Sequence, residues 1–98
     1  MVCGVEFNTY GQYSLIIPDS VTSIGDRAFQ YCVELRSITI PDSVTSIGDW
    51  AFDECGLTNI ITIPDSVTSI GEYAFYYTNI FGVTIPDSVI NIGQFAFG

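Results

Sequence analysis

The sequence is dominated by a nine-residue segment, Ile-Pro-Asp-Ser-Val-Thr-Ser-Ile-Gly, which occurs unchanged at residues 17–25, 40–48 and 63–71. A fourth copy at 85–93 differs only where Ile90 and Asn91 replace Thr and Ser. The first isoleucines of the four copies are 23, 23 and 22 residues apart. A fixed period of this length is typical of solenoids, in which each repeat forms one coil stacked on its neighbour.

The period divides the chain into coils of a single domain, 1–98. We expect a degenerate first coil, three full repeats and a partial last repeat, at residues 1–16, 17–39, 40–62, 63–84 and 85–98. An end coil is expected to be atypical because it has a neighbour on one side only. Each coil buries its second face only against a neighbour, so the fold is expected to be stable as a stack and not as single repeats.

Each repeat is expected to contribute two short strands. The first is a β-branched run before the proline, with its first and third residues pointing inward, at 15–17, 38–40, 61–63 and 83–85. Pro-Asp-Ser then ends the strand, because proline offers no N–H to a ladder. Val21–Ile24 and its copies are expected to form the second strand. Stacking of the coils predicts parallel ladders.

The segment that follows the second strand is expected to be a turn. Gly25 and its copies Gly48, Gly71 and Gly93 are expected to supply a positive φ. Residues 26–29 and their copies are expected to form a single helical or 3₁₀ turn, with Ala28 and Phe29 directed to the core.

The charge is strongly acidic, with eleven Asp and Glu against two Arg and a net charge of −9. Such a charge repels phosphate groups, so we expect neither nucleic acid nor an anionic membrane surface as a partner. Cationic proteins, cations and neutral surfaces remain compatible with it. Asp19, Asp42, Asp65 and Asp87 are expected to form one acidic column, and Asp26, Asp49 and Glu72 a second. Turn-forming carboxylates on a solvated edge explain both columns, and weak binding of a divalent cation is the alternative.

The cysteines do not form a closed disulfide framework, because there are three of them. Cys32 and Cys55 occupy the same repeat position. Small stacked residues are the simpler interpretation, but a Cys32–Cys55 bridge is geometrically conceivable between adjacent coils and stays open. Two thiols without a histidine fall short of a zinc site.

Catalysis is not supported by any motif. The chain has no histidine to act as a base, no glycine-rich phosphate loop after a strand, and no nucleophile beside an activating cation. We therefore expect no enzyme activity, no cofactor and no resident metal.

The repeat columns resemble the BspA-like, or type-5, leucine-rich repeat family. The matching residues are Leu35, Ile38, Ile40 and Pro41, followed by Val44, Ile47, Gly48, Ala51, Phe52 and Cys55. The resemblance covers about residues 15–98 and departs from the family pattern at Thr58 and Thr78, and the third repeat is one residue short. It implies a right-handed leucine-rich-repeat solenoid, mainly parallel β with short turns or 3₁₀ turns, and a parallel sheet on its concave side. It also implies a non-catalytic role in protein binding or adhesion, often on the cell surfaces of bacteria and protists.

The family's strand geometry implies which side chains face out from the concave sheet and form a candidate partner-binding surface. They are Tyr13, Ser14, Ile16, Arg36, Ser37, Thr39, Asn59, Ile60, Thr62, Phe81, Gly82 and Thr84. Apolar groups on an open face often mark a contact site. The expected partner is a protein or glycan. The alternative function is that of a structural or self-associating piece of a longer array, which stacks end to end through its open edges.

The localisation is not determined by the sequence. No apolar run reaches the ~18 residues of a membrane-spanning helix, so membrane insertion is not expected. The N-terminus lacks the basic and apolar regions of a signal peptide, which favours a cytoplasmic chain. The sequence stops at Phe97-Gly98, partway through a repeat, which instead favours a fragment of a longer, secreted or cell-surface protein.

Overall fold

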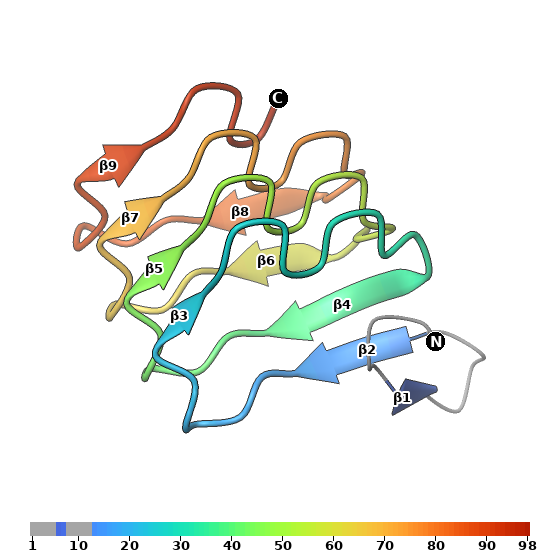
Figure 1. Cartoon of the computed structure of the whole chain (residues 1–98), viewed down its shortest axis with the longest axis horizontal. Helices are drawn as coiled ribbons and strands as arrows, with labels where there is room; N and C mark the ends of the chain where they lie inside the picture. Colours follow the sequence, from blue (N-terminus) through green and yellow to red (C-terminus); the bar gives the residue numbers. More distant parts are fainter. Residues whose placement is uncertain (1–5, 8–12) are drawn as a thin grey trace.

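The computed structural model describes residues 6–7 and 13–98. In these residues the chain forms short strands and no helix: β1 Glu6–Phe7, β2 Tyr13–Ile16, β3 Ser23–Ile24, β4 Leu35–Thr39, β5 Ser46–Ile47, β6 Ile60–Thr62, β7 Ser69–Ile70, β8 Gly82–Thr84 and β9 Asn91–Ile92. The strands lie in successive coils of a parallel β-solenoid (Figure 1). The predicted solenoid is therefore confirmed. No helix in the described part of the chain is long and apolar enough to cross a membrane.

The second strands of the repeats form one continuous ladder, β3-β5-β7-β9. All three pairings are parallel, and Ile24, Ile47 and Ile70 are paired at equivalent repeat positions. Strands of two residues hold few hydrogen bonds of their own, so a row of them is stable only as a stack.

The first strands of the repeats form two ladders on another side of the coils. β2 pairs with β4, and β6 with β8, both in parallel. β1 adds to the edge of β2 in the antiparallel direction. These strands begin one to three residues earlier than predicted, and the isoleucine before each proline follows the strand rather than ending it. The ladder is interrupted between β4 and β6.

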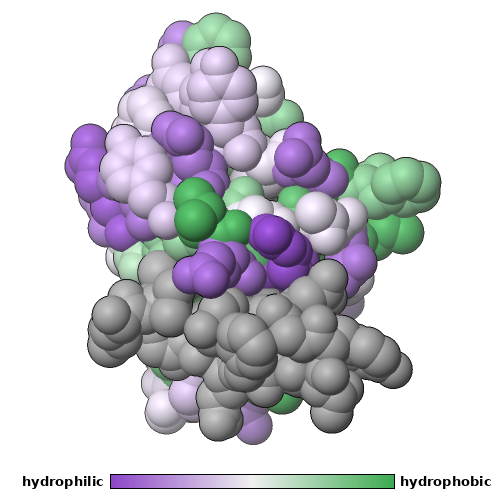
Figure 2. All heavy atoms as spheres, turned by 90° about the vertical axis from the view of Figure 1, so that its right-hand side faces the viewer, coloured by the Kyte–Doolittle hydropathy of each residue, from purple (hydrophilic) through white to green (hydrophobic). Residues whose placement is uncertain are grey.

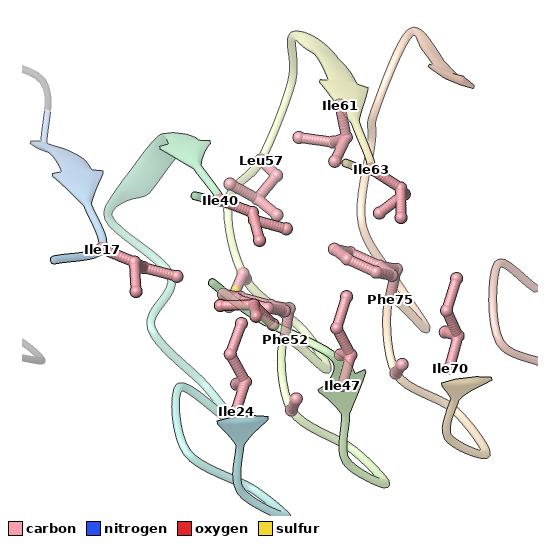
Figure 3. Packing of buried hydrophobic residues seen from close by; sticks show 14 of the residues in the cluster. Ile17, Ile24, Ile40, Ile47, Phe52, Leu57, Ile61, Ile63, Ile70 and Phe75 are labelled. Atoms are coloured by element: carbon pink, nitrogen blue, oxygen red, sulfur yellow. The ribbon is translucent and has the colours of Figure 1, made fainter. Parts of the chain in front are cut away.

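The core consists of rows of identical side chains that run along the stack. Figure 3 shows Ile24, Ile47 and Ile70 following one another, with Phe52 and Phe75 beside them. The phenylalanine rings stack with centroids 5.3, 5.1 and 5.3 Å apart, in the order Phe29, Phe52, Phe75, Phe97. Offset stacking of this kind is favourable beyond the burial of the rings. Equivalent residues of successive coils therefore lie directly over one another.

The repeat glycines are required for a reason other than the predicted one. Their φ values are not in the left-handed region. Instead, a Cβ atom on Gly48 would lie 2.6 Å from the backbone nitrogen of Asp26, and one on Gly93 would lie 2.3 Å from that of Glu72. The expectation of a positive φ at these glycines is wrong, because the close approach of the preceding coil excludes a side chain.

Positive φ values occur instead within the turns that follow the second strands. Arg27, Trp50, Tyr73 and Phe95, two residues after each glycine, have φ of 57–60°. The predicted helical turn is replaced by successive tight turns, in which Ala28 N–H donates to Gly25 O and Gln30 N–H to Arg27 O. Ala51 and Ala74 are buried as expected, but Ala28 is exposed. No described residue of a preceding coil covers it.

The disulfide considered between Cys32 and Cys55 does not form. Cys32 is disulfide-bonded, whereas Cys55 is a free, buried thiol. A Cys32–Cys55 disulfide is therefore absent, and the partner of Cys32 lies outside the described residues. Cys55 Sγ donates to Phe29 O across the coils, at 2.9 Å.

The acidic column beside the glycines links adjacent coils. Asp26 Oδ1 accepts from Asp49 N–H, and Asp49 Oδ1 accepts from Glu72 N–H, both at 2.8 Å. Hydrogen bonds to a charged acceptor are stronger than neutral ones. Among the described residues, no group of three or more potential ligands comes together to hold a metal ion.

Candidate binding surface

The candidate surface is the outward side of β2, β4, β6 and β8, which we call the strand face. Side chains alternate along each of these strands, so every second residue points away from the core. Ile16, Ile60 and Phe81 are 76%, 61% and 87% exposed on this side. In the β6–β8 pair Ile60 lies opposite Gly82. Phe81, the residue before β8, is aligned with Asn59, to whose carbonyl its N–H donates, so Ile60 and Phe81 lie on adjacent coils one position apart. Figure 2, which views the molecule from the right-hand side of Figure 1, shows green hydrophobic groups at its right margin and also between hydrophilic groups near the centre.

Threonines occupy the repeat position of Ile16 in the following coils. Thr39, Thr62 and Thr84 are all exposed, and Thr62 is paired with Thr84. Asn59 is exposed as well. These side chains offer hydroxyl and amide groups beside the apolar ones, a mixture found on many protein interaction surfaces.

The remaining residues predicted for this surface are less accessible to a partner. Ser14, Arg36 and Ser37 are half-buried, and the side chain of Tyr13 lies outside the described residues. The guanidinium of Arg36 donates to Val33 O at 2.8 Å and to Gly56 O at 3.2 Å, at the end of the coil. We infer that Arg36 ties two coils together and is the least suited of these residues to contact a partner.

A hollow of about 500 Å³ lies on this side, where the ladder is interrupted. It is lined by Ile38, Thr39, Ile40, Asp42, Ile60, Thr62, Ile63, Pro64, Asp65 and Thr84. A second hollow of about 480 Å³ adjoins it between Ile16 and Ser43. Both are open depressions with mixed apolar and polar walls, which suits a protruding side chain or a sugar ring.

The Pro-Asp-Ser turns form an acidic rim beside the strand face. Asp19, Asp42, Asp65 and Asp87 are all exposed, as predicted for the first acidic column. Asp42 and Asp65 also line the larger hollow. Repulsion between carboxylates ~5 Å apart is only ~0.8 kcal/mol in water, so the column is tolerated and gives the rim a negative potential.

Cys55, the free thiol among the described residues, does not provide a nucleophile at this surface. Cys55 is buried, and this burial raises the pKa of its thiol to about 12, with Asp53 adding to the rise and a backbone hydrogen bond from Cys32 opposing it. A thiol with this pKa is protonated at neutral pH and unreactive.

A group of aromatic side chains on the turns is not among the residues predicted from the sequence. Trp50, Tyr73 and Phe95 share one repeat position, two residues after the glycine, and Trp50 and Tyr73 stack with their centroids 4.1 Å apart. The signal was present as a column of aromatic residues with a period of 22–23 residues. It was overlooked because the segment was expected to be a helical turn.

A sequence model described as the BspA type leucine-rich repeat region, with six repeat copies, matches residues 6–98. The chain belongs to the BspA-type leucine-rich repeat family. The family resemblance seen in the sequence is thus confirmed over nearly the whole chain. None of the curated proteins compared with this family member matches it.

Solved structures of bacterial leucine-rich repeat proteins are similar to this BspA-type chain. A leucine-rich repeat protein from Bacteroides ovatus is 41% identical, with a TM-score of 0.79, over 86% of this chain and 22% of its own. A leucine-rich cell surface protein from Faecalibacterium prausnitzii is 39% identical, with a TM-score of 0.63, over 69% of this chain and 20% of its own. A protein from Eubacterium ventriosum is 28% identical, with a TM-score of 0.61, over 81% and 27%. The chain thus spans only about a quarter or less of the length of these proteins.

Proposed function

We propose that this chain is a non-catalytic interaction or adhesion module, which binds a protein or glycan partner through the strand face. The observation that carries the proposal is that three large apolar side chains on or beside β2, β6 and β8, Ile16, Ile60 and Phe81, are more than half exposed. Exposed apolar groups next to one another mark contact surfaces more often than isolated ones do. The hollow beside Ile60 offers a site for an anchoring group of the partner.

The acidic rim and the relatives add support. Exposed Asp19, Asp42 and Asp65 border the strand face and favour partners that carry positive or neutral groups opposite them. The Faecalibacterium protein is described as a cell surface protein, which is compatible with a role in adhesion. Cys55, the free thiol among the described residues, is buried and protonated, so it is not suited to act as a nucleophile.

The test is binding by a double variant, Ile60→Asp with Phe81→Asp. The purified chain is screened against an array of glycans and an array of purified proteins, and each hit is titrated. We expect the double variant to lose at least tenfold in affinity, because each buried apolar side chain contributes ~1.5–3 kcal/mol.

Ile90→Asp is the matched control. Ile90 is 78% exposed, but it lies beside β9 on another side of the coil, so the same chemical change is made away from the strand face. The control is expected to bind each hit as the original chain does. The proposal fails if the double variant keeps its affinity, or if Ile90→Asp weakens binding equally.

A second candidate function is end-to-end association of two copies. At one end of the stack, Leu15, Ile17, Val21, Ile24 and Phe29 line an apolar hollow of about 220 Å³. At the other end, Ile92 and Phe95 are half exposed. Ile70, the counterpart of Ile92 in the preceding coil, is buried. The two ends present equivalent repeat positions, so a second copy could continue the ladder in the same register.

Light scattering over a concentration series tests this association. We expect the mean mass of the 98-residue chain to rise with concentration, and Ile92→Glu to lower that rise because it places a charge on the exposed ladder edge. A strict monomer with an intact β signal in circular dichroism would exclude end-to-end association.

A further inference from the structure

Five aromatic rings contact one another on the turns between the second and first strands. They are Trp50, Tyr73, Tyr76, Tyr77 and Phe95, which we call the aromatic cluster. Trp50 and Tyr73 stack with an interplanar angle of 2°, and Tyr76 meets both rings edge-on, at 81° and 83°. The Tyr77 centroid lies 4.6 Å from that of Tyr76, and the Phe95 centroid 5.3 Å from that of Tyr73.

The backbone holds the cluster in place. Trp50, Tyr73 and Phe95 have φ of 59°, 57° and 57°, a region that bulky residues rarely adopt. Hydrogen bonds between coils maintain it, with Trp50 N–H donating to Glu72 O at 2.9 Å and Tyr73 N–H to Gln94 O at 3.0 Å. In Figure 1 these turns follow β5, β7 and β9 as successive loops. The rings are therefore presented by a rigid row of turns.

Arg27 places its guanidinium over one ring of the cluster. It occupies the repeat position of Trp50 in the preceding coil, and its Cζ lies 5.9 Å from the centroid of the Trp50 ring. A guanidinium over an aromatic face within ~6 Å makes a favourable cation–π contact. One of the two arginines of the chain thus already stacks on the end of the cluster.

The surroundings of the cluster are acidic. Asp49 and Glu72 immediately precede Trp50 and Tyr73, and Glu54 occupies the repeat position of Tyr77 in the neighbouring coil. Asp53 is 1% exposed, and its Oδ1 has no hydrogen-bond partner in the described part of the chain, while its Oδ2 accepts from Gln30 Nε2 at 3.0 Å.

Tyr76 contacts Trp50, Tyr73 and Tyr77 within the cluster. The pKa of Tyr76 is raised by its removal from water, and further by Tyr77, Tyr73 and Asp53. The carboxylate of Asp53 both opposes a phenolate and favours a nearby cation. The negative charge of the nearby carboxylates and the faces of the rings therefore both favour a cationic ligand.

We propose that the aromatic cluster is a second interaction surface, which binds arginine side chains of a cationic protein segment. Arginine fits better than lysine, because its planar guanidinium stacks on rings while its N–H groups reach carboxylates. Tyr77 and Phe95 are the more exposed members of the cluster and are available to such a side chain. The surface lies on the turns, so the proposal does not depend on binding by the strand face.

The test uses a synthetic peptide of alternating arginine and glycine as the probe. Trp50 is the single tryptophan of the chain, so its fluorescence reports directly on binding at the cluster. We expect the arginine peptide to shift the Trp50 emission and to bind less tightly as salt rises. A peptide in which lysine replaces arginine is expected to bind more weakly. A peptide in which citrulline replaces arginine has nearly the same shape but no charge, and it is expected not to bind.

Tyr77→Asn and Tyr31→Asn form a matched pair of variants. Both tyrosines share one repeat position, with φ of 55° and 64° and exposures of 69% and 61%. Asn adopts this backbone region readily, so neither change is expected to disturb the fold. Tyr31 makes none of the ring contacts found among the described residues, so only Tyr77→Asn should lower the affinity, by about two- to fivefold.

Arg27→Gln provides the opposite change. It opens one face of Trp50 and removes a positive charge, so it should raise the affinity for the arginine peptide. The proposal is overturned if the citrulline peptide binds as well as the arginine peptide, if the two tyrosine variants lose affinity equally, or if Arg27→Gln brings no gain. Circular dichroism of each variant verifies that the β-solenoid is intact.

Discussion

At Gly71, an added Cβ atom would lie 2.4 Å from Asp49 Oδ1 and 2.5 Å from Asp49 N. Gly48 and Gly93 meet the preceding coil in the same way. At Gly25, by contrast, no atom lies within 4 Å of such a Cβ. The same residue in the same motif is thus required in three coils and free in one, because only the neighbouring coil excludes the side chain.

Gly71→Ala and Gly25→Ala should therefore differ in stability. Gly71→Ala is expected to lower the free energy of unfolding by about 1–3 kcal/mol, the usual effect of overpacking. Gly25→Ala is expected to leave it unchanged or to raise it by up to about 1 kcal/mol, because alanine restricts the unfolded chain. Urea denaturation followed by circular dichroism measures both, and equal losses would contradict the steric explanation.

At the scale of the element, the strands could be predicted from the sequence pattern, whereas the conformation of the turns depends on contacts between coils. β3, β5, β7 and β9 are two-residue strands, and they exist because each is paired with its copy in the next coil. The sequence predicted a strand at Val21–Ile24 and its copies, and the structure forms it over the last two residues of each. The turns were not predicted correctly, because their positive φ values at Arg27, Trp50 and Tyr73 are maintained by hydrogen bonds to the next coil. Such residues carry no local signal for this conformation.

At the scale of the molecule, stability is a property of the stack. Phe52 and Phe75 are fully buried because a phenylalanine ring lies on both sides of each. Among the described side chains, Phe29 and Phe97 have such a neighbour on one side. The folding free energy of repeat proteins is approximately a sum of terms within coils and between neighbouring coils. A change in a central coil disturbs two interfaces, and a change in an edge coil disturbs one.

Phe52→Ala and Phe97→Ala test this dependence on position. Phe52→Ala is expected to cost about 3–5 kcal/mol, as for a fully buried aromatic residue, and to unfold the chain under many conditions. Phe97→Ala should cost less than half of this amount, because Phe97 is half-buried and stacks on a single ring. Chemical denaturation measures both changes. Similar losses for the two would contradict the nearest-neighbour description.

The candidate surface could be predicted only in part. Ile16, Ile60 and Phe81 were expected to face outward, and they are exposed. The hollow between β4 and β6 was not expected, because it depends on an interruption of the ladder. Nearly identical repeats predict a continuous ladder. The half-buried state of Arg36 depends on the carbonyl groups of two coils, and these meet only in the folded stack.

The sequence by itself determined the period, the presence of two short strands in each repeat and the rows of the core. A motif repeated every 22 or 23 residues can bury its apolar side chains in one way, against its own copy in the next coil. The tertiary structure alone decided the φ values of the turns, the steric need for glycine, the free state of Cys55 and the contacts of the aromatic cluster. Each of these depends on distances between coils, and side chains far apart in the sequence set those distances.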